Sequence, residues 1–120
     1  MATKRMLQLA EQIREFVALL FAQGRLSDPR LKGITINSVR LSPDLEHAKV
    51  YFSLFPSDEA AKKTAIEGLK QASGFIRHEL GKTLEIRFTP KIMFYYDDSV
   101  EHASKINSLI ENIKKESPSE

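Results

Sequence analysis

The residues with the clearest potential for chemistry are basic side chains grouped around a run of small residues, Ala72-Ser73-Gly74. These side chains are Lys70, Arg77, Lys82, Arg87 and Lys91. A helix that begins just after a small-residue break presents free N–H groups and the positive end of its dipole, which suit a phosphate. Glycine at the break also lets a sugar-phosphate chain approach the backbone closely. The same pattern is equally consistent with ordinary solvated positions around a helix kink.

Metal-ligand chemistry is weakly indicated. The chain has three histidines, His47, His78 and His102, and no pair of them has metal-ligand spacing. Asp97 and Asp98, with Glu101 nearby, carry oxygens of the kind that hold Mg²⁺. Acidic residues just before a helix also cap its free N–H groups, and this is the interpretation that we favour.

The candidate catalytic motifs in the sequence are incomplete. Gly81-Lys82-Thr83 resembles the end of a phosphate-binding P-loop, but that loop requires glycine where this chain has Ile76. The P-loop also follows a strand and opens a helix, whereas here a helix is expected before it and a strand after it. Ser73 does not follow a strand, as a nucleophile elbow requires, and there is no cysteine. We therefore expect a non-enzymatic protein without a cofactor or a small-molecule substrate.

Composition and charge favour a single soluble domain. A length of 120 residues fits one domain, and 42% hydrophobic with 28% charged residues is an ordinary globular balance. No apolar run is long enough to span a membrane and no secretory pattern is present, so we expect a cytoplasmic protein. Residues 97–120 carry three lysines and six acidic residues, so the overall charge of +2 leaves +5 on residues 1–96. That excess suits a polyanionic partner.

The first half of the chain predicts a helix followed by a β-hairpin. Apolar residues recur at helical spacing from Thr3 to Phe21, and Gly24 is the expected C-terminal cap. Strands are expected at about 34–41 and 47–54. In the first strand the apolar residues stand at even positions up to Ile36 and at odd positions from Val39 onward. A bulge near Asn37-Ser38 would let both sets face the same side of the sheet.

The second half predicts two shorter helices over residues 58–80, separated at Ala72-Ser73-Gly74 and ending at Gly81. A third strand is expected from Leu84 to Tyr96, with an edge or bulge at Pro90. A last helix would follow Asp98. The fold class is therefore α+β, in the order α-β-β-α-(kink)-α-β with a C-terminal helix and a three-stranded sheet. We expect one domain over 1–113 and a short solvated tail over 114–120.

Several stretches in this order resemble the ribosome-binding factor A family. They cover roughly residues 5 to 100 and include Asp28-Pro29-Arg30-Leu31, Ala48-Lys49-Val50-Tyr51, Ala72-Ser73-Gly74-Phe75-Ile76-Arg77, Leu80-Gly81-Lys82, Arg87, Pro90, Phe94, Tyr96-Asp97 and Ser99. The Ala-Ser-Gly-Phe-Ile-Arg run followed by Leu-Gly-Lys is the most specific part.

The resemblance implies a type II KH-like domain in which an Ala-x-Gly kink replaces the usual Gly-x-x-Gly loop. It implies a bacterial factor that binds the small (30S) ribosomal subunit and its rRNA during late maturation and 16S rRNA processing, and that is important for growth in the cold. We expect a monomer that acts by occupancy. The expected RNA-binding residues are Lys70, Ser73, Gly74, Arg77 and Lys82, with Arg30, Lys32 and Arg87 as further candidates.

Two other classes of function stay open at this point. One is a protein–protein adaptor on the same KH-like scaffold that makes no direct contact with RNA. The other is a hydrolase built on Asp97 and Asp98. Salt-insensitive binding to ribosomal proteins would support the adaptor, and metal-dependent turnover would support the hydrolase.

Overall fold

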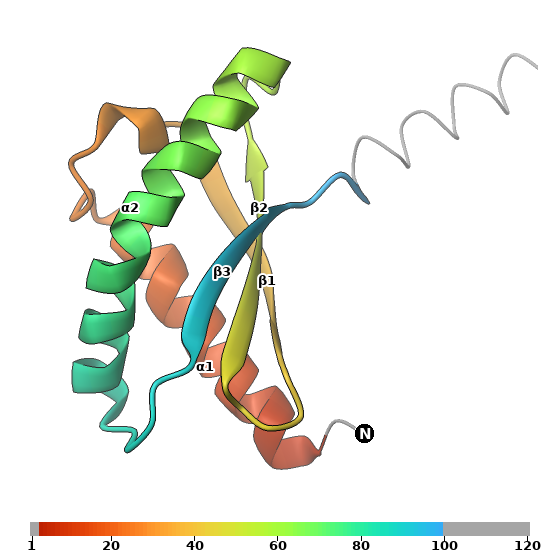
Figure 1. Ribbon diagram of the computed structural model, residues 1–120, viewed down its shortest axis with the longest axis vertical. Coiled ribbons are helices and arrows are strands. Elements are labelled where there is room, and N and C mark those ends of the chain that lie inside the picture. Colours follow the sequence, from red (N-terminus) through yellow and green to blue (C-terminus); the bar gives the residue numbers. More distant parts are fainter. Residues whose placement is uncertain (1–2, 100–120) are drawn as a thin grey trace, which may run out of the picture.

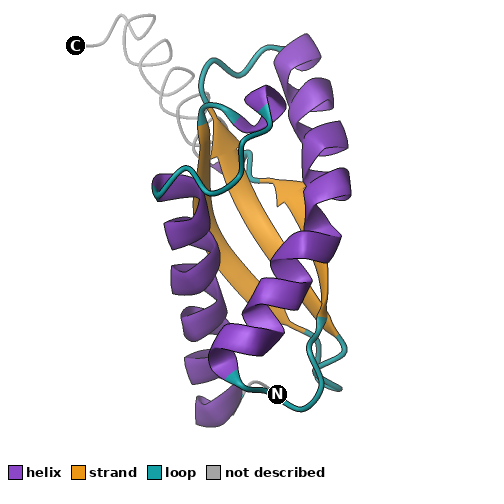
Figure 2. Ribbon diagram, turned by 90° about the vertical axis from the view of Figure 1, so that its left-hand side faces the viewer, coloured by secondary structure: helices purple, strands orange, loops and turns teal. Residues whose placement is uncertain are grey.

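A computed structural model describes residues 3–99, in which two helices cover one face of a three-stranded sheet (Figure 1). The elements are α1 (Lys4–Ala22), the 3-10 turn η1 (Pro29–Leu31), β1 (Ile34–Leu41), β2 (His47–Leu54), α2 (Glu59–Leu84) and β3 (Lys91–Tyr96). Figure 2 shows both helices in front of the sheet. The predicted α+β class and three-stranded sheet are confirmed, and the described elements follow the predicted order except that one helix stands where two were expected. The predicted last helix and the tail lie outside the described residues, apart from Ser99.

Helix α1 begins and ends as its sequence predicts. The hydroxyl of Thr3 accepts a hydrogen bond from the backbone N–H of Met6 at 3.1 Å, which caps the first turn. Gly24 follows the helix with φ of +66°, a left-handed conformation that glycine adopts without strain. Within the part of the chain that the structure describes, no helix has the length and apolar character needed to cross a membrane.

The sheet is mixed, with β2 at its centre. Strands β1 and β2 are antiparallel, and their register shifts between Ile36 and Ser38. Asn37 is the extra residue, so the bulge considered from the sequence is present. The shift lets Ile36 and Val39 face the same side of the sheet although their positions differ in parity. Strand β3 pairs with β2 in parallel, and α2 is the crossover that a parallel pair requires.

Strand β3 is shorter than the sequence predicts. Leu84 is the last residue of α2, and residues 85–90 form a loop. The reason lies in the register, because Lys91 is opposite His47, the first residue of β2. Residues before Lys91 would lie beside the hairpin turn, where no strand is available to pair with them. The apolar alternation that suggested a strand leaves Phe88 81% exposed.

Helix α2 is one uninterrupted helix, so the predicted break at Ala72-Ser73-Gly74 is wrong. The kink is present in another form, because Figure 1 shows the axis of α2 changing direction partway along. The hydroxyl of Ser73 donates a hydrogen bond to the carbonyl oxygen of Lys70 at 2.9 Å, the kind of bond that bends helices. The predicted end at Gly81 is also wrong, because the helix continues to Leu84 and stops where Glu85 is left-handed, with φ of +52°.

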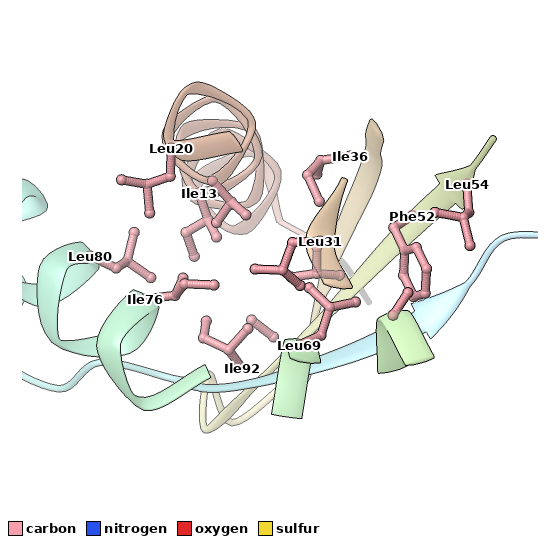
Figure 3. Packing of buried hydrophobic residues seen from close by; sticks show 14 residues of the cluster. Ile13, Leu20, Leu31, Ile36, Phe52, Leu54, Leu69, Ile76, Leu80 and Ile92 are labelled. Carbon is pink, nitrogen blue, oxygen red and sulfur yellow. The ribbon is translucent and has the colours of Figure 1, made fainter. Parts of the chain in front are cut away.

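The core lies between the two helices and the sheet. Figure 3 shows side chains from both layers pointing toward a common centre. Those that are buried and labelled include Ile13 and Leu20 of α1, Leu69, Ile76 and Leu80 of α2, and Ile36, Phe52 and Ile92 of the sheet. Because one continuous apolar stripe of α2 is buried here, packing outweighs the cost of about 1 kcal/mol for each internal glycine. The opposite side of α2 faces outward.

Candidate nucleic-acid interface

A ridge of basic side chains runs along the outward side of α2. Lys63, Lys70 and Arg77 are spaced seven residues apart, so they point the same way with a drift of about 20° per heptad. All three are exposed. Glu67 is the one carboxylate on this side of the helix between Lys63 and Arg77, by the same spacing. We call Lys63, Lys70, Gly74 and Arg77 the α2 ridge.

Ser73 and Gly74 lie between the two cationic ends of this surface. They are three and four residues after Lys70, which places them on its side of the helix. A methyl group added at Gly74 would meet nothing within 4 Å, so the backbone is open to approach at that point. The helix is continuous here, however, so its N–H groups are engaged in helical bonds. The expected phosphate site made of free N–H groups is therefore absent, and side-chain cations with close backbone approach remain.

Arg77 has a structural partner as well as an exposed position. Its guanidinium donates from Nε and Nη2 to the carbonyl oxygen of Thr89, at 3.2 and 2.9 Å. Arginine has five N–H donors in total, so others stay available to a phosphate. The bonds hold the loop 85–90 against α2. This places Arg87, an exposed residue of the same loop, at the Arg77 end of the ridge.

Lys82 lies apart from the ridge. It is five residues beyond Arg77, which turns its side chain about 140° around the helix at roughly 100° per residue. Its Nζ is 3.8 Å from the Glu79 carboxylate, which also accepts a hydrogen bond from Arg25 at 2.7 Å. The Arg25 bond lowers the pKa of Glu79, and the positive charge of Lys82 adds to this effect. The structure therefore separates Lys82 from Arg77, although the sequence brings them together.

The guanidinium group of Arg30 is engaged in hydrogen bonds within the protein. Its guanidinium donates to both oxygens of Asp28, at distances from 2.5 to 3.0 Å, and to the side-chain oxygen of Gln71 on α2 at 2.7 Å. These contacts join η1 to the middle of α2, next in sequence to Lys70. The Arg30 hydrogen bonds also hold the pKa of Asp28 below its ordinary value. Lys32 follows η1 and is exposed.

The carboxylate considered for metal binding has protein partners instead. Asp97 accepts hydrogen bonds from the backbone N–H of Ser99 at 3.0 Å and from the side-chain amide of Asn37 at 2.9 Å. Contacts with Ser99 and Asn37 lower the pKa of Asp97. The bond to Ser99 spans two residues, as in an Asx turn. The helix that acidic residues were expected to cap lies beyond Ser99, outside the described residues. Glu101 lies outside the described residues.

Sequence reasoning missed a second group of side chains, on the face of the sheet that the helices leave open. Arg40, Lys49, Tyr51 and Tyr95 point to this side, and each ring lies next to a cation. The available signal was the alternation of Lys49 and Tyr51 with the buried residues Ala48 and Val50. This alternation indicated that Lys49 and Tyr51 share one face of the strand, but not which residues of the neighbouring strands lie beside them.

Comparisons with known proteins identify the family. The family model described as ribosome-binding factor A matches residues 5–110. The chain belongs to the ribosome-binding factor A family. It is 42% identical over 113 residues to the ribosome-binding factor A of Geobacter metallireducens, covering 94% of each chain. The family resemblance inferred from the sequence is thereby confirmed.

Solved structures of ribosome-binding factor A share the fold. A solution structure of a putative ribosome binding factor A from Thermotoga maritima is 37% identical, with a TM-score of 0.68 over 80% of this chain and 90% of that one. A homology model of the Thermus thermophilus protein, fitted into a cryo-EM map of a 30S complex of that factor, is 26% identical. Its TM-score is 0.55, over 72% of this chain and 93% of that one. The KH-like α+β fold is confirmed.

Proposed function

We propose that this protein binds the small ribosomal subunit and its rRNA in the cytoplasm during late maturation and 16S rRNA processing. It acts by occupancy and holds an immature RNA conformation rather than cutting it. The observation that carries the proposal is the family match over residues 5–110, together with the Thermus thermophilus relative placed in a 30S complex. The α2 ridge supplies the surface, because exposed cations on a rigid helix suit an RNA backbone.

The ridge is a better phosphate surface than the residue set expected from the sequence. Lys63 and Lys70 are exposed, and Arg77 retains donors beyond those given to Thr89. Lys82 and Arg30 form ion pairs with Glu79 and Asp28, which offset their positive charges, so they contribute less to the attraction of a polyanion. Arg87 and Lys32 remain secondary candidates at the margins. Ser73 lies within the ridge, and its bond to the Lys70 carbonyl oxygen is of the kind that bends helices.

Co-sedimentation with separated small and large ribosomal subunits tests the proposal. We expect wild type to sediment with small subunits and not with large ones. Lys63→Glu combined with Lys70→Glu should weaken this association by about tenfold or more, because repulsion is added to lost attraction. Neither residue belongs to the core, so circular dichroism should be unchanged.

The matched control is Lys4→Glu combined with Arg5→Glu, which makes the same charge change at exposed positions of α1. It should bind within about twofold of wild type if the position of the charge matters. Equal losses in both double variants would mean that only total charge attracts the subunit. Normal binding by the Lys63/Lys70 variant would favour the adaptor that touches ribosomal proteins alone.

A further inference from the structure

The open face of the sheet carries aromatic and basic side chains. Among residues 3–99 both helices lie on the other face, so nothing described covers this side (Figure 2). The outward residues include Arg40 of β1, Lys49 and Tyr51 of β2, and Lys91 and Tyr95 of β3. Tyr95 is 40% exposed, and Tyr51 is partly buried.

The two tyrosines form a pair across adjacent strands. Tyr51 and Tyr95 are register partners in the parallel β2–β3 ladder, and their ring centroids are 5.8 Å apart with an interplanar angle of 31°. The rings are therefore neighbours that do not stack flat on each other. Each leaves ring surface that a planar group can cover.

A cation accompanies each ring. The Arg40 guanidinium carbon is 5.8 Å from the centroid of Tyr51, and the Lys49 Nζ is 5.9 Å from the centroid of Tyr95. Lys91 adds a third exposed cation on the edge strand. This combination of aromatic faces and nearby positive charge is what proteins use to hold single-stranded nucleic acid.

Negative charge on this side is confined to the ends of the sheet. Asp97 follows β3 and is engaged by Asn37 and Ser99. Asp44 and Glu46 lie in the β1–β2 turn, where the Asp44 carboxylate accepts from Ser42 and from the Glu46 N–H. The middle of the face therefore has positive charge only, among the described residues.

From this arrangement we infer that the open sheet face is a second RNA surface, which binds a single-stranded segment with bases on Tyr51 and Tyr95 and phosphates near Arg40 and Lys49. The inference rests on the proposed function and adds a site to it. Bases in a duplex are already stacked and paired, so the rings select unpaired RNA. The α2 ridge lies on the far side of α2 from the sheet, so one molecule holds two separate RNA segments.

Binding of a short, unstructured, fluorescently labelled oligouridylate to the full chain tests this surface without the ribosome. Fluorescence anisotropy should show binding to the single strand and much weaker binding to a blunt duplex of similar length. Tyr51→Leu with Tyr95→Leu should lower affinity for the single strand by about fivefold or more for each ring, the usual contribution of base stacking. Tyr51→Phe with Tyr95→Phe should bind like wild type, because the ring faces remain.

The control variant is Phe88→Leu, which removes an exposed ring in the loop 85–90 and should leave oligouridylate affinity unchanged. Lys63→Glu with Lys70→Glu should weaken small-subunit binding more than oligouridylate binding, which separates this surface from the ridge. The inference is overturned if wild type does not bind the single strand, or if the leucine variant binds it like wild type. It is equally overturned if the leucine variant loses only small-subunit binding, since a ribosomal protein would then be the occupant. NMR contacts from residues 100–120 to both rings that persist with RNA would also overturn it.

Discussion

The guanidinium group of Arg77 donates two hydrogen bonds to the carbonyl oxygen of Thr89, at 3.2 and 2.9 Å. Four residues after Arg77, Gly81 lies against the same threonine, because a methyl group added there would stand 2.4 Å from Thr89 Oγ1. The loop 85–90 is thus held to α2 by an arginine and by a close backbone approach. That loop leads from α2 into β3, and Arg77 therefore links the candidate RNA surface to the fold.

We predict that Arg77→Glu lowers the free energy of unfolding by about 1 kcal/mol, the usual net value of an intramolecular hydrogen bond. Urea denaturation measures this change. Lys70→Glu, which has no such bond to the loop, should stay within about 0.5 kcal/mol of wild type. An Arg77→Glu protein as stable as wild type would show that the Thr89 contact does not anchor the loop.

Local patterns in the sequence predicted the elements, and the errors came from relationships between elements. The stripes of α1 and α2 and the alternation in β2 follow from helical and extended periodicity, so they were readable. Gly81 suggested the end of a helix, but it lies inside α2, where the absence of a side chain allows close contact with Thr89. Helical periodicity carries no information about a contact with a residue outside the helix. The start of β3 depended on where β2 begins, and periodicity carries no information about that partner.

The candidate site was only partly predictable for the same reason. Spacing along one helix places Lys70, Gly74 and Arg77 on one side, so this part of the site follows from the sequence. Arg30 and Lys82 were expected to be available, although Asp28 and Glu79, their ion-pair partners, lie only two and three residues away in the sequence. The contacts of Arg30 with Gln71 and of Glu79 with Arg25 join distant parts of the chain, and no signal in the sequence indicated them.

We predict that Asp28 contributes to the pH dependence of stability. Hydrogen bonds from Arg30 hold its pKa below the usual value of 3.8. A lowered carboxyl pKa gives stability that is complete above this value and is lost as the pH falls through the lower folded value. Asp28→Asn should therefore be less stable than wild type at neutral pH, and the two should converge below about pH 4.

Thermal melting at a series of pH values measures this convergence. Asp98→Asn at an exposed position is the matched control and should track wild type throughout. A constant difference between Asp28→Asn and wild type, from neutral to acidic pH, would mean that the ion pair does not provide the stability.

We predict a steep salt dependence for binding to small subunits. Each phosphate neutralised releases counterions, so log affinity falls against log salt with a slope of about −0.7 to −0.9 per contact. Three contacts from the α2 ridge would cost about two orders of magnitude over a tenfold rise in salt. Titrations at several salt concentrations measure the slope, and Lys70→Glu should make it shallower by about one contact. A flat response in wild type would favour the protein–protein adaptor.

The last prediction concerns Gly74, where stability and binding should move in opposite directions. The helix is continuous at this position and an added methyl group meets nothing within 4 Å, so Gly74→Ala should raise the free energy of unfolding by about 0.5–1 kcal/mol. The same methyl group stands between Lys70 and Arg77, where we expect an RNA backbone to approach closely. Small-subunit affinity should therefore fall, as measured by co-sedimentation.

Thr64→Ala is the matched control, because Thr64 is an exposed position of α2 that lies about 80° around the helix from Gly74 and about 120° from Lys70, at roughly 100° per residue. It too should raise stability, since alanine is the better helix former, but leave affinity unchanged. If Gly74→Ala is more stable and binds normally, close backbone approach at the bend is not part of recognition. If Gly74→Ala is less stable than wild type, the helix in solution is not continuous at this position. The pairing of the two variants thus separates helix propensity from contact with RNA, because both introduce the better helix former but only Gly74→Ala adds a side chain on the ridge.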